Sequence, residues 1–244
     1  MLHKADNNLI KDLKKQKREN DSLLFLDNFK IIKDAIRGGL TPKYILLDDE
    51  KNNIFGDQNC PILKVEKHTI EQFSDSKTPQ GVVCIVEFTQ HIVEKPKGNF
   101  LVLDRIQDPG NAGTLIRTAT ACGFEYVFML DSVKPTNSKL VRSSVGTIFK
   151  SKLISLTSHE FVKLAKEWQL NLLVADMDGE NIFTFNCDKQ IGLIVGNEGQ
   201  GVSDELIEIC SNKVKIPMVE GVESLNVAIS GGIIMYQIAK NNLN

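Results

Sequence analysis

The sequence lacks the cysteine and histidine patterns that hold metal ions. Its five cysteines are scattered, odd in number and form no CxxC pair, and its four histidines show no HExxH spacing. Structural and catalytic zinc sites depend on such spacings. We therefore expect no bound metal, and reduced thiols with a mostly structural role. The cysteines are Cys60, Cys84, Cys122, Cys187 and Cys210.

Long hydrophobic runs are also absent. No segment approaches the roughly 20 consecutive apolar residues of a membrane-spanning helix, and the Lys- and Asn-rich first residues lack the apolar stretch of a signal peptide. These absences predict a cytoplasmic protein without a membrane partner. The 42% hydrophobic and 25% charged residues are typical of a globular protein, and 244 residues suit one large or two modest domains.

The formal net charge of −2 does not indicate a nucleic-acid-binding protein, but the charge is unevenly distributed. Residues 1–43 contain ten lysines and arginines against six acids, and residues 134–152 contain five basic residues and no acid. Such clusters can follow a phosphate backbone, although a solvated surface loop and helix explains the second cluster equally well. Its basic residues are Lys134, Lys139, Arg142, Lys150 and Lys152.

Short apolar segments alternate with helix-like segments along the chain. The polar, Lys-rich first residues fit a helix or a loosely held arm, and apolar residues at 29, 32, 35 and 36 predict a helix by their 3-and-4 spacing. Strands at 44–47, 62–65 and 81–86 and a short helix at 68–73 complete a small α/β layer over residues 1–95. The Pro- and Lys-containing stretch 94–98 has the composition of a linker. In residues 99–244 the strands are continuously apolar, which predicts a parallel sheet covered by helices on both faces. Strands are predicted at 100–104, 126–130, 172–175, 192–195 and 213–216, and helices at 112–122, 138–144, 158–168, 204–210 and 226–240.

Three loops at the carboxyl ends of these strands carry the functional signals, because ligands bind at this edge of open α/β sheets. In the first, a Pro-Gly-Asn turn precedes a helix whose free amide groups could bind an anion, and Arg117 could present a guanidinium to a phosphate. An ordinary turn with a surface arginine is the alternative. The chain contains neither GxGxxG nor a Walker-type Gly-Lys-Ser/Thr motif.

The second loop, GNEGQG from residue 196, has three glycines that let the backbone approach a ligand closely, and a single carboxylate, Glu198. In the third loop, Ile216, Met218 and Leu225 could line an apolar slot for a planar ring, while Ser224 and Asn226 orient the ligand. A tight turn and ordinary core packing are the alternatives for these two loops.

Taken together and in this order, the segments NAGTLIRTA, IVGNEGQGVS and IPMVEGVESLNVA resemble the three motifs of the SpoU (TrmH-type) RNA ribose 2′-O-methyltransferases of the SPOUT superfamily. The resemblance covers residues 99–244 and implies a parallel-sheet α/β domain with a C-terminal trefoil knot. Residues 1–95 resemble more loosely the family's ribosomal-protein-like RNA-binding domain, with Asp27-Asn28 where relatives usually have Glu-Gly.

The resemblance implies an enzyme that binds S-adenosylmethionine and RNA and acts as a homodimer. Arg117 would bind the phosphate beside the target ribose, since a guanidinium stays protonated in proteins and is a poor base. Phosphate contacts to RNA would come from Lys134, Lys139, Arg142 and Lys150. The catalytic residues would be Asn111, Arg117, Glu198, Ser224 and Asn226, and the cofactor would be held by Gly196, Glu198, Gly199, Ile216, Met218, Leu225 and Asn226.

The auxiliary N-terminal domain favours ribosomal RNA over tRNA as the substrate. Three other functions remain open from the sequence: a tRNA ribose methyltransferase, a non-catalytic RNA-binding relative, and a nucleotide-binding α/β enzyme that uses residues 109–113 as its phosphate loop. The intact second and third loops argue against a pure binding protein, and the absent nucleotide motifs argue against the last alternative.

Overall fold

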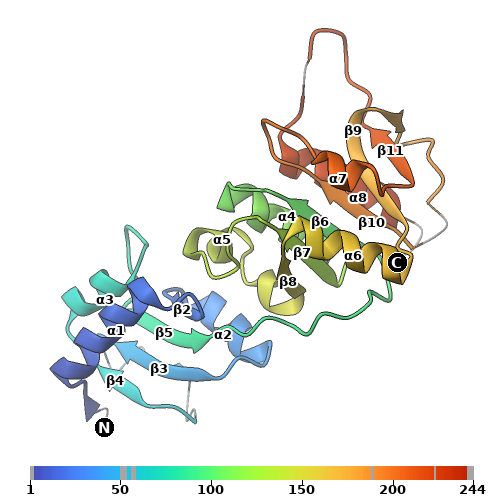
Figure 1. The fold of residues 1–244 in the computed structure, drawn as a ribbon. Helices are drawn as coiled ribbons and strands as arrows, with labels where there is room; N and C mark the ends of the chain where they lie inside the picture. Colours follow the sequence, from blue (N-terminus) through green and yellow to red (C-terminus); the bar gives the residue numbers. More distant parts are fainter. Residues whose placement is uncertain (1–2, 50–53, 56–58, 188–189, 223, 241–244) are drawn as a thin grey trace. The chain divides into compact units, whose positions relative to one another are not determined.

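The computed structural model describes residues 3–49, 54–55, 59–187, 190–222 and 224–240 (Figure 1). The chain forms two compact units. The first contains Met1–Thr89 and Thr136–Phe149, and the second contains Gln90–Pro135 and Lys150–Asn244. Residues 136–149 lie within the predicted domain 99–244 in the sequence and group with the first unit in space. Helix α5 (Ser138–Ser143) buries Leu140 and Val141 and packs against a strand of that unit.

The first unit is built on a five-stranded sheet with the order β1-β4-β3-β5-β2. Strand β5 is antiparallel to both of its neighbours, and the other pairs are parallel. The strands are β1 (His3–Lys4), β2 (Leu23–Leu26), β3 (Pro42–Leu47), β4 (Ile62–Lys64) and β5 (Val82–Glu87). Besides α5, the helices are α1 (Asn7–Glu19), α2 (Phe29–Arg37) and α3 (Lys67–Phe73), and a 3-10 helix η2 spans Thr147–Lys150.

Helices α1 and α2 follow from the sequence in different ways. The 3-and-4 apolar spacing predicted α2, which begins after Asn28, whose side chain accepts from the amides of Lys30 and Ile31, and ends before Gly38. The sequence left α1 open between a helix and a loose arm. It is a helix because Leu13 is buried in the core of the first unit while Lys11 and Lys15 are exposed to solvent. Strand β2 was not predicted.

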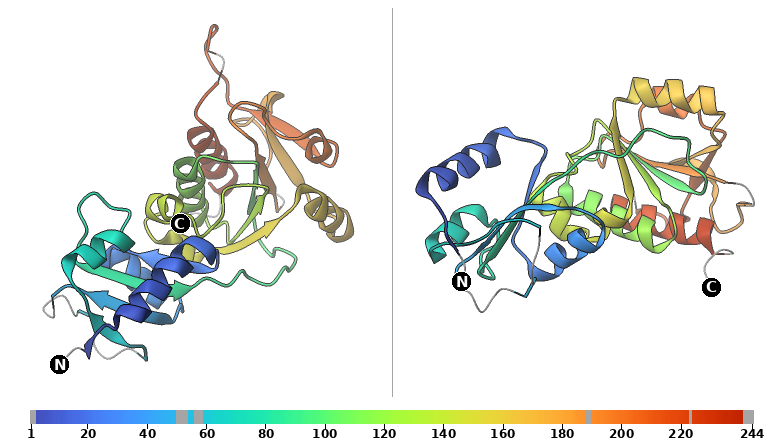
Figure 2. Two further views of the ribbon diagram at one scale, coloured as in Figure 1. Left: turned by 60° about the vertical axis from the view of Figure 1, so that its left-hand side comes forward. Right: turned by 90° about the horizontal axis from the view of Figure 1, so that it is seen from below.

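The second unit contains a six-stranded, fully parallel sheet with the order β11-β9-β10-β6-β7-β8, which confirms the predicted α/β fold with a parallel sheet. Figure 2 shows α6 on one face of this sheet and α4 with α8 on the other. The strands are β6 (Phe100–Asp104), β7 (Tyr126–Leu130), β8 (Lys152–Leu156), β9 (Leu172–Asn181), β10 (Gly192–Val195) and β11 (Asn212–Lys215). The helices are α4 (Pro109–Ala121), α6 (Ser158–Trp168), α7 (Asp204–Ile207) and α8 (Val227–Ala239).

Helix α8 packs closely against α4 within the same chain. A Cβ added at Gly231 would lie 2.5 Å from Cδ2 of Leu115, and one added at Gly232 would lie 3.6 Å from Cγ2 of Thr118. The missing side chain at Gly231 therefore permits the close approach of two helices within one chain.

The described part of the chain contains neither a candidate membrane-spanning helix nor a candidate metal site. None of its helices has the length and apolar character needed to cross a membrane. The same residues contain no cluster of three or more histidine, cysteine or carboxylate side chains arranged to bind a metal ion.

Candidate functional site

Three side chains from the three sequence motifs meet at the carboxyl edge of the parallel sheet. Asn111, in the first turn of α4, donates from Nδ2 to Oε1 of Glu198 at 2.7 Å. Asn226, directly before α8, donates from Nδ2 to Oδ1 of Asn111 at 3.1 Å. We call these three residues the motif network. Glu198 and Asn226 are 87 and 115 residues from Asn111 in the chain, so the fold alone brings the three together.

Helix ends hold the two asparagines of the motif network in place. The amide of Asn111 donates to the N-cap residue Asp108 at 2.8 Å, with Pro109 in the first helical position. Oδ1 of Asn226 caps α8 by accepting from the amides of Ala228 and Ile229. Each side-chain amide therefore has one fixed orientation, and the exposed Glu198 keeps its second carboxylate oxygen for another partner.

The loop that carries Glu198 is shaped by its neighbours in the sequence. Oδ1 of Asn197 accepts from the amides of Gly199 and Gln200 at 2.9 and 3.2 Å. At Gly196, an added Cβ would lie 2.3 Å from the carbonyl carbon of Gly201. Glycine is thus required at 196 because the loop folds back on itself. The sequence analysis assigned Gly196 only to the cofactor and did not single out Asn197.

Arg105 is a second residue that the sequence analysis missed. Its backbone is in the left-handed region, with φ of 55°. Its guanidinium donates to Oε1 of Gln200 at 3.0 Å and to the carbonyl of Gly201 at 3.3 Å, and it pairs with the buried carboxylate of Asp104. Its own carbonyl accepts from Nδ2 of Asn197 at 3.0 Å. Arg105 therefore ties the end of β6 to the loop that carries Glu198. In the sequence, the one feature that could have pointed to Arg105 is its position directly after Asp104, at the end of an apolar strand.

We expect Arg105→Ala to lower kcat about tenfold and to reduce stability by about 1–3 kcal/mol, because a buried carboxylate loses a charged partner. Arg105→Gly removes the same side chain but suits the positive φ, so it should be the more stable of the two variants by about 1 kcal/mol. Methyl-transfer rates and chemical denaturation of both variants test this. Equal stability of the two would contradict the role assigned to the backbone.

The remaining predicted catalytic residues lie outside the motif network. Arg117 is exposed on α4, and no hydrogen bond or ion pair joins its guanidinium to another residue in the described part of the chain. Ser224 is exposed and lines a cavity of about 480 Å³ together with Ile216, Met218 and Leu225. Gly196, Glu198 and Gly199 are not part of that lining. The predicted cofactor residues thus fall into an apolar cavity and the loop after β10, except for Asn226, which caps α8.

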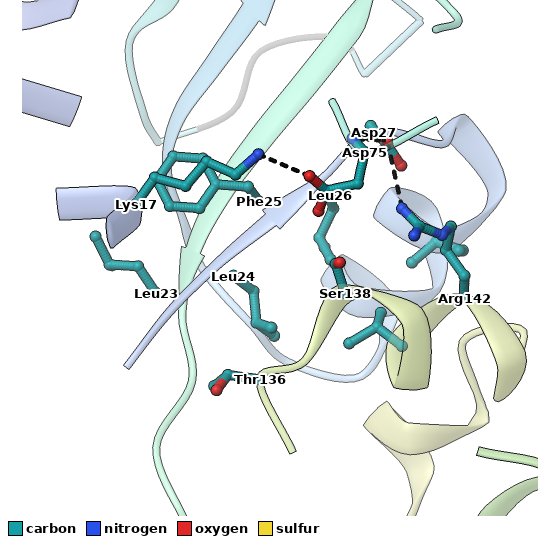
Figure 3. Close-up of a pocket in the computed structure, with 12 residues that line it drawn as sticks. Lys17, Leu23, Leu24, Phe25, Leu26, Asp27, Asp75, Thr136, Ser138 and Arg142 are labelled. Atoms are coloured by element: carbon teal, nitrogen blue, oxygen red, sulfur yellow. Dashed lines mark hydrogen bonds and ion pairs between the residues drawn. The ribbon is translucent and has the colours of Figure 1, made fainter. Parts of the chain in front are cut away.

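The four predicted RNA-binding residues do not all belong to one unit. Lys139 and Arg142 belong to the first unit, and Lys134 and Lys150 to the second. Arg142 faces an acid: its Nη1 lies 3.8 Å from Oδ2 of the buried Asp27 (Figure 3). The sequence analysis did not predict this pair, because Asp27 is more than 100 residues from Arg142 in the chain.

Lys152, the fifth basic residue of that cluster, is engaged within the second unit. It donates to Glu94 at 2.9 Å and to the hydroxyl of Tyr126 at 2.9 Å, and it pairs with Glu125 at 3.0 Å. Hydrogen bonds with Tyr126 and Glu94 raise the pKa of its ammonium group. Lys152 therefore holds part of the linker against the sheet, and its charge is largely compensated.

The family model described as the SpoU rRNA Methylase family matches residues 98–236. The chain belongs to this family. The resemblance inferred from the three motifs is thereby confirmed, and the protein is an RNA methyltransferase.

Relatives of this SpoU protein match over nearly its whole length. The 23S rRNA (guanosine(2553)-2′-O)-methyltransferase RlmP of Bacillus subtilis is 27% identical, covering 97% of this chain and 98% of its own. The fold matches the AdoMet-bound rRNA methyltransferase of Sinorhizobium meliloti, with a TM-score of 0.84 at 24% identity over 100% and 98% of the two chains. A TrmH/SpoU tRNA-modifying enzyme of A. aeolicus matches 61% of this chain and 77% of its own, at 24% identity and a TM-score of 0.54.

Proposed function

We propose that this SpoU protein transfers the methyl group of S-adenosylmethionine to a ribose 2′-hydroxyl of ribosomal RNA. The observation that carries the proposal is the motif network, in which one residue from each family motif meets the others at the ligand-binding edge of the sheet. The relative RlmP is named for this reaction on 23S rRNA.

The cavity and the neighbouring loop have the chemistry that the cofactor requires. Ile216, Met218 and Leu225 supply apolar side chains for a planar adenine ring, and Ser224 supplies a hydroxyl. Gly196, Glu198, Gly199 and Asn226 would hold the polar part of the cofactor, partly through backbone groups. When bound, S-adenosylmethionine supplies a methyl group already activated by its sulfonium centre.

The protein residues then have to orient the ribose and help its hydroxyl to lose a proton. Arg117 is exposed, and its guanidinium has no partner among the described residues, so it can bind the phosphate beside the target ribose with two parallel hydrogen bonds. The free carboxylate oxygen of Glu198 can accept a hydrogen bond from the ribose or from Arg117. Asn111, Ser224 and Asn226 complete the site by fixing these groups.

Incubation with methyl-labelled S-adenosylmethionine and total cellular RNA, followed by size separation and 2′-O-methyl mapping, tests the proposal. We expect label at one ribose of large-subunit ribosomal RNA. Label in tRNA would preserve the chemistry and overturn the substrate. A protein that fails to bind S-adenosylmethionine would overturn the proposal itself.

Ribosomal RNA is favoured over tRNA by the extent of the structural matches. The fold of the rRNA methyltransferase of Sinorhizobium meliloti covers the whole chain, whereas that of the tRNA-modifying enzyme of A. aeolicus covers 61% of it. We further propose that residues 1–95 act mainly as an RNA-binding domain before a methyltransferase domain at 99–244, and that Lys134, Lys139, Arg142 and Lys150 contact phosphates. Such a domain would recognise RNA largely by shape and by its 2′-hydroxyls.

We also propose that the chain between β11 and α8 forms the trefoil knot of the SPOUT superfamily. Strand β11 lies at one edge of the sheet, while α8 packs against α4 and β10 nearer the middle. The chain must therefore return across the sheet after its last strand, as it does when a knot is threaded. A cytoplasmic location accords with a ribosomal RNA substrate and with the absence of disulfides among the five cysteines.

The protein is proposed to work as a homodimer through the outer face of α8. Ile229, Tyr236 and Phe183 are each more than half exposed, at 56%, 51% and 52%, and they line one shallow apolar surface that also includes Thr118 on α4. Exposed apolar patches of this kind mark interaction sites. Because Arg117 adjoins Thr118, a second subunit on this surface would lie next to the phosphate-binding group.

We expect Tyr236→Glu to convert the dimer to a monomer, because a charge buried without a partner opposes association. Light scattering coupled to size-exclusion chromatography measures the change. Ile92→Glu is the matched control, since Ile92 is 86% exposed just before the linker and does not line this surface. A dimer that survives Tyr236→Glu would exclude this interface.

A further inference from the structure

A second, chemically different hollow lies in the first unit, between α1 and the β1–β4 edge of the sheet. It has a volume of about 230 Å³, and four lysines line it. They are Lys4, Lys11, Lys14 and Lys64, which we call the lysine hollow. None of the residues of the motif network or of the cavity at Ile216 contributes to it.

The fold concentrates these lysines from three separate elements. Lys11 and Lys14 are three residues apart on α1, a spacing that places both on one face of the helix. Lys4 and Lys64 are register partners in the parallel pair of β1 and β4, so they project from the same face of the sheet. Residues far apart in the sequence thus surround one opening.

Much of this charge is uncompensated within the described part of the chain. The ammonium groups of Lys4, Lys11 and Lys14 form no hydrogen bond or ion pair there, whereas those of Lys15 and Lys17 on α1 pair with Glu19 and Asp75. The acid in the lining, Glu66, is 3.2 Å from Nδ1 of His68. Like charges that line one opening repel one another, and a bound anion reduces the repulsion.

We infer that the lysine hollow binds the phosphate backbone of the substrate RNA, at a place separate from the methyl-transfer site. The inference rests on the proposed function, because it makes the RNA the source of the phosphate. Lysine ammonium groups are point charges without the planar fork that reads a base edge, so the contact is independent of sequence. The volume is below the roughly 300 Å³ of ordinary small-molecule sites, which suits a backbone phosphate better than a whole free nucleotide.

The test compares two double variants of the full chain that each remove two positive charges. Lys11→Gln with Lys14→Gln changes the hollow, and Lys30→Gln with Lys33→Gln changes two exposed lysines of α2 in the same unit. Affinity for deproteinised ribosomal RNA is measured over a range of salt concentrations, together with affinity for S-adenosylmethionine. We expect the first double variant to bind RNA about tenfold more weakly and its log–log salt slope to fall by about 1.5. The second should match the wild type, and cofactor affinity should be unchanged in both.

Several outcomes would overturn the inference. They are an equal loss of RNA affinity in both double variants, no loss in the first, or wild-type protein that does not bind the RNA. Loss of binding to phosphatidylglycerol vesicles without loss of RNA binding would assign the hollow to a lipid surface instead. If the first double variant unfolds, Lys4→Gln with Lys11→Gln replaces it, because both side chains are exposed.

The proposed function can fail separately from this inference. A wild-type protein that neither binds S-adenosylmethionine nor methylates RNA would refute the methyltransferase function, whatever the lysines do. Normal methylation with unchanged RNA affinity of the Lys11/Lys14 double variant would refute only the inference about the lysine hollow.

Discussion

Replacing Arg117 with alanine is expected to lower kcat for methyl transfer about a thousandfold and to leave the stability of the fold unchanged. The guanidinium would hold the phosphate next to the reacting ribose, and loss of a single preorganised charged donor typically costs about 10²–10³ in rate. Stability should not change because the side chain is exposed and its guanidinium forms no hydrogen bond or ion pair with the described residues. Single-turnover methylation and thermal denaturation measure the two quantities.

Two further variants make this result specific to Arg117. Arg117→Lys keeps the charge but cannot form two parallel hydrogen bonds, so an intermediate rate is expected. Arg37→Ala removes an exposed arginine from the end of α2 and should leave kcat unchanged. Near-normal turnover of Arg117→Ala would refute the role assigned to this residue.

Gly196→Ala is expected to lower both the stability and the methyl-transfer rate, because the loop backbone leaves no room for a Cβ at this position. The new Cβ would lie 2.3 Å from the carbonyl carbon of Gly201 and 2.4 Å from the amide nitrogen of Val202. These are backbone atoms, so the loop must open and move Glu198 away from Asn111. We expect a loss of about 1–3 kcal/mol in stability and about a hundredfold in rate, since a misplacement of about 1 Å has that effect.

The matched control for Gly196→Ala is Gly98→Ala. An added Cβ at Gly98 meets nothing within 4 Å, and its backbone is outside the left-handed region. Denaturation curves and methylation rates should match those of the wild type. If Gly196→Ala retains wild-type activity and stability, the close approach of the two loop segments is not required.

Much of the second unit could be predicted because its strands are continuous apolar runs between turn signals. Strands β6, β7 and β10 have the predicted bounds, as does α6 with its Thr157–Glu160 capping box. Strand β8 was missed because Lys152 and Ser155 interrupt its apolar pattern, and it is a strand because Leu153 and Ile154 are buried in the sheet. Strand β2 was missed for a different reason, since LLFL fits a short helix as well as a strand.

The sequence by itself determined the family, since each of the three motifs is a continuous run of residues and the three occur in the family's order. It also determined the identity of Asn111, Glu198 and Asn226. Only the tertiary structure decided that these three form a hydrogen-bonded network, that Arg105 braces the loop of Glu198, and that Arg142 faces Asp27. The physical reason is that partners about 90 to 115 residues apart are chosen by strand order and helix packing, which no local pattern encodes.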